Sequence, residues 1–191
     1  MEKNKLQWIL ITLVVLIPYL IFYGLEHPDS LIARCLWMEP SYVKVRKGEA
    51  MMDAFVSYSS AEDVLTQLNF YSELNVDTST VDLGSGRYGP PSKRYIVNVA
   101  HYVNLDVEGF LSFVFFNDRL SSMIFYPQNP LTYKENLMKD QNLKVRLNER
   151  IKVGPHMTLE YKEELSSQKI YFKWEDQRLK AEENAWMMRH S

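Results

Sequence analysis

The chain has 191 residues, enough for one domain of ordinary size with a short additional segment. Hydrophobic residues make up 46% and charged residues 24%, a composition typical of globular proteins rather than of disordered or fibrous ones. A net charge of −2 with scattered lysines and arginines provides no basic surface for nucleic acid, and the single cysteine, Cys35, excludes a disulfide within the chain.

The segment 6–25 is strongly apolar and contains no charged residue. A helix of this length spans roughly 30 Å, the thickness of the hydrocarbon core of a membrane. Lys3 and Lys5 precede the segment and acidic residues follow it, so the positive-inside rule places residues 1–5 in the cytoplasm. The segment therefore predicts a single-pass transmembrane helix in the bacterial inner membrane, with the rest of the chain in the periplasm.

Other interpretations of this region fit the sequence less well. A cleavable signal peptide needs small residues at its cleavage site, whereas Gly24 is preceded by Ile21 and Phe22. A buried core helix normally has one polar face, which this segment lacks. Lipid attachment at Cys35 is also disfavoured, because Arg34 stands where a lipoprotein signal has a small or aliphatic residue.

After an expected connector over 26–48, patterns typical of helices and strands begin. Ser60 and Asp63 form a capping-box pattern, and apolar residues at helical spacing then predict a helix over 60–70. A polar stretch with several glycines over 77–91 is expected to be a loop. Runs of β-branched and aromatic residues then predict three strands, over 95–103, 111–117 and 120–126.

A similar order of elements follows a second time. Residues 131–140 predict another helix, and strands are expected over 157–163 and 169–174. Gly-Pro precedes a strand in both halves, at Gly89-Pro90 and at Gly154-Pro155, and an aromatic strand runs into an acidic turn in both. A strand triplet with one apolar face cannot bury that face alone, so two such units are expected to share a core or a sheet.

The predicted fold class is therefore α+β, with an N-terminal transmembrane helix followed by a domain over 49–191. This domain is expected to consist of two tandem helix-plus-antiparallel-strand (αβββ) units, at about 55–127 and 130–185. The order of helix, Gly-Pro, strand and hairpin resembles the BamE/SmpA-type unit, and tandem copies resemble the β-lactamase inhibitor protein fold over about residues 55–185. The resemblance implies a place outside the cytoplasm and binding to other proteins. Without a lipid-attachment site, it does not imply a role in outer-membrane assembly.

Few residues are candidates for catalysis. His101 and His156 fall in the predicted first strands of the two units, where they could form a symmetric pair, although two separate strand histidines are the simpler interpretation. No closely spaced metal-binding histidines, phosphate-binding glycine loop or nucleophile motif occurs in the sequence. We therefore expect no enzyme activity, no metal and no cofactor.

The aromatic content favours protein binding instead. The chain contains twelve tyrosines and four tryptophans, residue types that dominate binding hot spots. Aromatic residues at alternate strand positions fill the core with one set and can present the other set to a partner. The predicted binding residues are Tyr95, Tyr102, Tyr171, Trp174 and Trp186.

The function predicted from the sequence is thus a membrane-anchored periplasmic module that binds another protein. A specific form is an immunity protein that neutralises a toxin acting in the periplasm. The alternative is an assembly or scaffolding subunit of a bacterial envelope or secretion complex, and an enzyme is the third hypothesis. The expected partners are another protein and, through residues 6–25, the membrane, with no nucleic acid.

Overall fold

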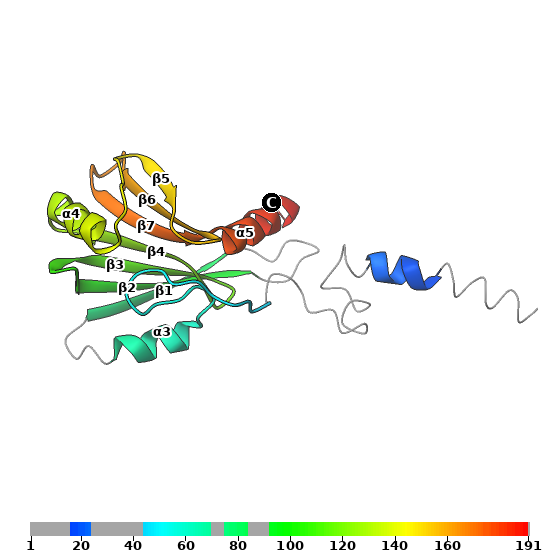
Figure 1. Ribbon diagram of the computed structural model, residues 1–191. Helices are drawn as coiled ribbons and strands as arrows, with labels where there is room; N and C mark the ends of the chain where they lie inside the picture. The colour runs from blue at the N-terminus through cyan, green and yellow to red at the C-terminus, as the bar shows by residue number, and fades with distance from the viewer. Residues whose placement is uncertain (1–15, 24–43, 70–74, 84–91, 191) are drawn as a thin grey trace, which may run out of the picture. The chain divides into compact units, whose positions relative to one another are not determined.

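A computed structural model describes residues 16–23, 44–69, 75–83 and 92–190 (Figure 1). The chain divides into two compact units, Met1–Lys44 and Val45–Ser191. In the first unit, the described residues form a helical stretch over 16–23. None of the helices within the described residues is both long enough and apolar enough to cross a membrane.

This finding corrects the predicted membrane anchor. Only 16–23 of the expected transmembrane helix 6–25 are described, and its other residues, with most of the connector 26–48, lie outside the described residues. The single-pass anchor, and with it the predicted inner-membrane location, is therefore not supported.

The second unit is built around one seven-stranded antiparallel sheet with the strand order β1-β2-β3-β4-β7-β6-β5. The first four strands follow one another as a meander, and β4 then pairs with β7 instead of with β5. Its elements in chain order are α3 (Ala61–Leu68), β1 (Asn75–Asp82), β2 (Lys93–Asn104), β3 (Val107–Phe116), β4 (Arg119–Pro127), α4 (Pro130–Asp140), β5 (Glu149–Lys152), β6 (Met157–Glu163), β7 (Ile170–Asp176) and α5 (Gln177–His190).

The predicted fold class, a transmembrane helix followed by two αβββ units, is therefore wrong. Strands of both halves belong to one sheet, because residues 122–125 of β4 lie opposite residues 172–175 of β7. The first half contributes four strands, since 75–82, expected mostly as loop, forms the edge strand β1. The second half ends in α5, a helix that was not predicted. The rest of the expected loop, including Gly89-Pro90, lies outside the described residues.

Local sequence signals set several of these boundaries. The Ser60 hydroxyl accepts a hydrogen bond from Asp63 N at 3.1 Å, and the Asp63 carboxylate accepts one from Ser60 N at 3.2 Å, which confirms the capping box of α3. Asn129 caps α4 through its side chain. Between β3 and β4, Asn117 and Asp118 have φ of 49° and 57°, the left-handed conformation that a two-residue type I′ hairpin turn requires.

One face of the sheet carries the hydrophobic core, and α3, α4 and the segment 49–58 cover it. The buried side chains from the covering elements include Phe55, Val64, Leu68, Tyr133 and Leu137, and those from the strands include Val97, Leu111, Phe113, Met123, Phe125, Leu159, Phe172 and Trp174. The Tyr133 ring lies 4.8 Å from each of the Phe125 and Phe172 rings, measured between centroids. Burying each such side chain contributes about 1.5–3 kcal/mol, so this layer dominates the stability of the unit.

A polar cluster ties the segment 49–58 to the end of β7. Ser57 Oγ donates to Asp176 Oδ2 at 2.7 Å, and Arg178 Nη2 donates to the same oxygen at 2.6 Å. Burial alone would raise the pKa of Asp176, but hydrogen bonds from Arg178 and Ser57 outweigh it and hold that pKa below its usual value. Glu49 lies 3.7 Å from Arg178 and completes the cluster.

A second polar chain, buried at Tyr133 and exposed at Asp53, links the same segment to β2 and α4. The Tyr133 hydroxyl donates to Asn104 Oδ1 at 2.6 Å, and Asn104 Nδ2 donates to Asp53 Oδ1 at 2.7 Å. Tyr102 donates to the other Asp53 oxygen at 2.6 Å. A partner at the buried Tyr133–Asn104 end is costly to remove, because a buried polar group left unsatisfied costs about 1–3 kcal/mol.

Replacing Tyr133 with phenylalanine removes one hydroxyl and leaves the Asn104 amide oxygen without this donor. We expect the free energy of unfolding, measured by urea denaturation, to fall by about 1–2 kcal/mol. The control is Tyr126→Phe, which removes the hydroxyl of a partly exposed tyrosine and should change the free energy by less than about 0.5 kcal/mol. Equal losses in the two variants would contradict a structural role for the Tyr133–Asn104 bond.

Candidate functional site: the open face of the sheet

The face opposite the core is only partly covered, and we call it the open face. Helix α5 covers one end, where Lys180 and Glu183 line a depression together with Arg94 of β2. The buried side chains of α3 and α4 belong to the core on the other face. Strand register places these residues of the four central strands on the open face: Arg94, Ile96, Asn98, Phe110, Ser112, Val114, Ser122, Ile124, Tyr126, Tyr171, Lys173 and Glu175.

Three aromatic side chains form a row across β3, β4 and β7. The centroid of the Phe110 ring lies 6.1 Å from that of Tyr126, which lies 5.6 Å from that of Tyr171. Phe110 is 42% exposed, a large fraction for a ring on a sheet face. Burial raises the pKa of both tyrosines, so each keeps a neutral hydroxyl that can donate a hydrogen bond.

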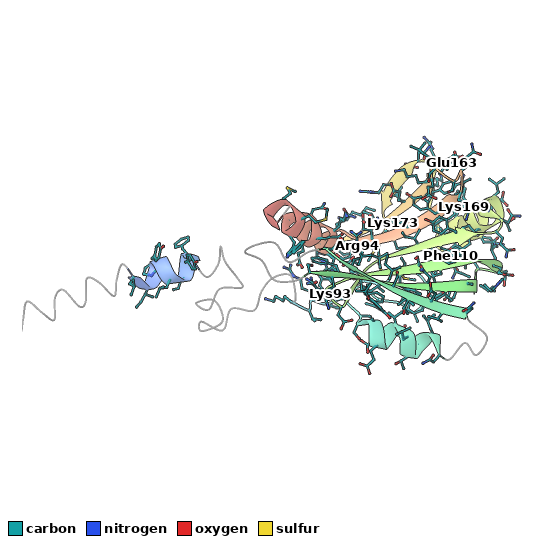
Figure 2. All side chains as sticks on the ribbon, turned by 180° about the vertical axis from the view of Figure 1, so that it is seen from behind. Lys93, Arg94, Phe110, Glu163, Lys169 and Lys173 are labelled. Atoms are coloured by element: carbon teal, nitrogen blue, oxygen red, sulfur yellow. The ribbon has the colours of Figure 1, made fainter. Side chains whose placement is uncertain are left out.

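Two grooves border this aromatic row. The larger has a volume of about 470 Å³ and is lined by Phe110, Tyr126, Lys169 and neighbouring residues of the β2–β3 end, the β4–α4 junction and the β6–β7 connection. The smaller has a volume of about 270 Å³ and shares the same three side chains, with Ile124 and Ser112 on its floor side. Figure 2 shows Phe110 and Lys169 at the end of the sheet away from α5. An apolar surface and a cation are therefore presented side by side.

A third depression, of about 300 Å³, lies at the α5 end and is charged. Arg94 Nε donates to Glu183 Oε1 at 3.1 Å, and Lys180 Nζ lies 3.1 Å from Glu183 Oε2. Lys173 and Glu175 form another pair at 2.5 Å. Burial alone would raise the pKa of Glu183, but the hydrogen bond and charge of Arg94 outweigh it and hold that pKa below its usual value. These charges neutralise one another, and the pair of Arg94 with Glu183 fastens α5 to the sheet.

Replacing Arg94 with methionine leaves the Glu183 carboxylate, 7% exposed, with a weaker set of partners. We expect the free energy of unfolding at pH 7 to fall by roughly 2 kcal/mol, less than for a fully buried pair because Arg94 is 32% exposed. The pKa of Glu183 is depressed in the folded protein, so its stabilising effect is present above the unfolded-state pKa and is lost as the pH falls through the folded-state pKa.

The difference between wild type and Arg94→Met should therefore shrink when the pH falls below about 4, near the usual range for a glutamate. Urea denaturation at a series of pH values measures it. Lys93→Met, which changes the adjacent exposed cation, is the matched control and should have little effect at any pH. A difference that stays constant down to pH 3 would contradict the assigned pairing of Arg94 with Glu183.

The two histidines considered as a catalytic pair do not come together. Through the strand pairings, His101 lies near the Pro127 end of β4, whereas His156 lies near the Arg119 end. These ends are separated by about 25 Å at the usual rise per strand residue. His101 Nδ1 instead lies 2.5 Å from Glu108 Oε1. Among the described residues, no three side chains of metal-binding type are grouped to hold an ion.

The five binding residues predicted from the sequence lie on different surfaces. Tyr102 and Trp174 are 2% and 1% exposed and belong to the core. Tyr95 packs partly buried against the core, and Trp186 is buried within α5. Tyr171 is the member of this set that lies on the open face, beside Tyr126.

Sequence reasoning missed Phe110 and Tyr126, the other two members of the aromatic row. Phe110 lies two positions from Ser112 on the same face of β3. A serine on one face of an otherwise apolar strand favours that face as the one away from the core, so this spacing was an available signal for Phe110. In β4, Ser121 and Ser122 are adjacent and give no such signal for Tyr126.

Comparison with models of known protein families found no match to this chain, and comparison with curated proteins found none either. The resemblance to BamE/SmpA-type units therefore stays a prediction.

Proposed function

We propose that this protein binds another protein through the open face, with Phe110, Tyr126 and Tyr171 at the centre of the contact. The observation that carries the proposal is the aromatic row itself, bordered by two grooves on a sheet face that α5 covers only at one end. Aromatic side chains in such positions are the residues that contribute most to protein–protein affinity.

The apolar character extends beyond the three rings. An antiparallel sheet with one face on the core usually exposes polar side chains on the other face. Here Ile96, Val114 and Ile124 occupy open-face positions on three neighbouring strands and are each only partly buried. Removing this surface from water on binding would contribute roughly 25 cal/mol for each Å² of apolar area covered. Contiguous apolar patches of this kind mark interaction sites.

Charge favours a particular chemistry in the partner. Lys169 lines both grooves beside Phe110 and Tyr126, and within the described residues no ion pair is formed by its ammonium group. A partner segment that presents an apolar or aromatic side chain next to a carboxylate would match the rings and this cation together. Glu164, at the smaller groove, would disfavour a purely acidic segment.

The proposal keeps the binding role predicted from the sequence and drops its location. The immunity and envelope-assembly hypotheses depended on a periplasmic domain behind a membrane anchor, which is not supported. The enzyme hypothesis depended on His101 and His156, which lie at opposite ends of the sheet.

Replacing Phe110 with alanine should weaken binding of the partner about tenfold or more, because the ring is the most exposed member of the row. Proteins captured by the immobilised full chain are identified by mass spectrometry, and the affinity of each for wild type and variant is then measured by calorimetry. The matched control is Leu131→Ala, which truncates a 66% exposed leucine of α4 on the other side of the sheet.

The thermal midpoint of Phe110→Ala should stay close to that of wild type, since the ring is exposed, and this separates loss of binding from loss of fold. Equal binding by Phe110→Ala and wild type would contradict the proposal. So would an equal loss in Leu131→Ala.

A further inference from the structure

The two edges of the sheet are protected very unequally. The edge strand β5 has four residues, ERIK, two of them basic. The opposite edge strand β1 has eight residues, NVDTSTVD, without proline or lysine, and pairs with β2 in unbroken register. Its side chains from 75 to 81 are all exposed. Natural sheets usually shorten, charge, bulge or cover an edge of this length, because its unpaired backbone groups bind other strands.

Hydrogen bonds at the end of β1 show which of its backbone groups point outward. Leu83 N donates to Ser92 O at 3.0 Å, so these two residues form a hydrogen-bonded pair. The carbonyl group of Lys93, the next residue of β2, points toward β3. It accepts a hydrogen bond from Asn117 N at 3.0 Å. Hydrogen-bonded and non-hydrogen-bonded residue pairs alternate along an antiparallel ladder. The pair of Asp82 with Lys93, next to the hydrogen-bonded pair of Leu83 with Ser92, is therefore not hydrogen-bonded.

The same alternation continues along the strand. Val76, Thr78 and Thr80 occupy pairs of the same kind as Asp82, so their N–H and C=O groups point away from β2. Within the described residues, no strand lies on that side of β1. A regular row of outward donors and acceptors is therefore available at even-numbered positions.

We propose that β1 pairs with β1 of a second copy of this chain, antiparallel, about a two-fold axis that passes through the sheet at Thr78. Two-fold dimers are the commonest soluble oligomers, and this axis joins the two edges while each face continues into the same face of the second copy. Such an axis always sets even positions opposite even ones and odd opposite odd. This is the arrangement that the outward groups of Val76, Thr78 and Thr80 require.

The side chains favour a two-fold axis at Thr78 over one at either adjacent residue. There Val76 lies opposite Thr80 of the second copy, Thr78 lies opposite its own equivalent, and Asp77 lies opposite Ser79. Cross-strand pairs of β-branched residues are favourable, and no like charges are opposed. An axis at Asp77 would set two carboxylates opposite each other, and one at Ser79 would set Asp77 opposite Val81.

This pairing makes the strand self-complementary, which is why a second copy is favoured over an unrelated strand. The dimer would also place two open faces on the same side of one extended sheet. The inference rests on β1 alone and does not depend on the partner protein proposed above.

Analytical ultracentrifugation of the full chain over a range of concentrations tests the proposal, with Thr78→Pro as the decisive variant. Proline removes the outward N–H at the axis but no bond of the β1–β2 ladder, and edge strands tolerate proline at such positions. Thr78→Val keeps the N–H and the branched shape and is the matched control. We expect wild type and Thr78→Val to sediment as dimers, and Thr78→Pro to dimerise at least about a hundredfold more weakly with an unchanged circular dichroism spectrum. A monomeric wild type, or an undiminished dimer of Thr78→Pro, would overturn the proposal.

Disulfide cross-linking of introduced cysteines tests the register of the β1–β1 pairing even if the proline variant fails to fold. In a Cys35→Ser background, Thr78→Cys sets two thiols opposite each other with Cα atoms about 5.5 Å apart, within the range of a disulfide. The equivalent positions of Val81→Cys would lie about 20 Å apart. Mild oxidation should therefore cross-link Thr78→Cys into a covalent dimer and leave Val81→Cys monomeric. No cross-link at position 78, or a preferred one at position 81, would contradict the axis.

Discussion

The pairing of β4 with β7 is the contact on which the rest of the structure depends. It involves residues 122–125 and 172–175 and is the seam where the two halves of the chain meet. Because each strand has two faces, this one pairing makes both faces of the sheet continuous. On the core face, Tyr133 of α4 packs against Phe125 and Phe172 across the seam. On the open face, Tyr126 and Tyr171 meet across it. The candidate binding surface therefore exists only because the two halves share a sheet.

Local patterns were enough to predict most elements of the unit but not its two edge strands, β1 and β5, or its last helix. The capping box at Ser60 and the β-branched runs of the central strands act over a few residues, so they can be recognised in sequence. Strand β1 contains the polar run from Asp77 to Thr80, which an exposed edge tolerates but which is also typical of a loop. The buried positions of α5 include Glu183, and that glutamate is accommodated through Arg94, far away in the chain. No local apolar stripe reveals such a helix.

The candidate site shows a different limit of sequence reasoning. Alternation divides the aromatic residues of a strand into two sets, but it does not say which set faces the covering helices. Trp174 and Tyr171 differ by three positions in β7, and one is in the core while the other is on the open face. The choice is made by α3 and α4, which cover one face and leave the other to α5. The predicted anchor depended on the length and apolar composition of residues 6–25 and on the charges beside them, and no helix of the described residues meets the requirements for crossing a membrane.

Native-state hydrogen exchange tests most directly whether the seam unites the two halves. If β4 and β7 belong to one cooperative sheet, the slowest amides of β3, β4, β6 and β7 should exchange with the same free energy, equal to that of global unfolding. The Tyr133 contacts on both sides of the seam provide the physical reason for this expectation. Exchange of β6 and β7 at a clearly lower free energy, while β3 and β4 stay protected, would show two independent units and contradict the account.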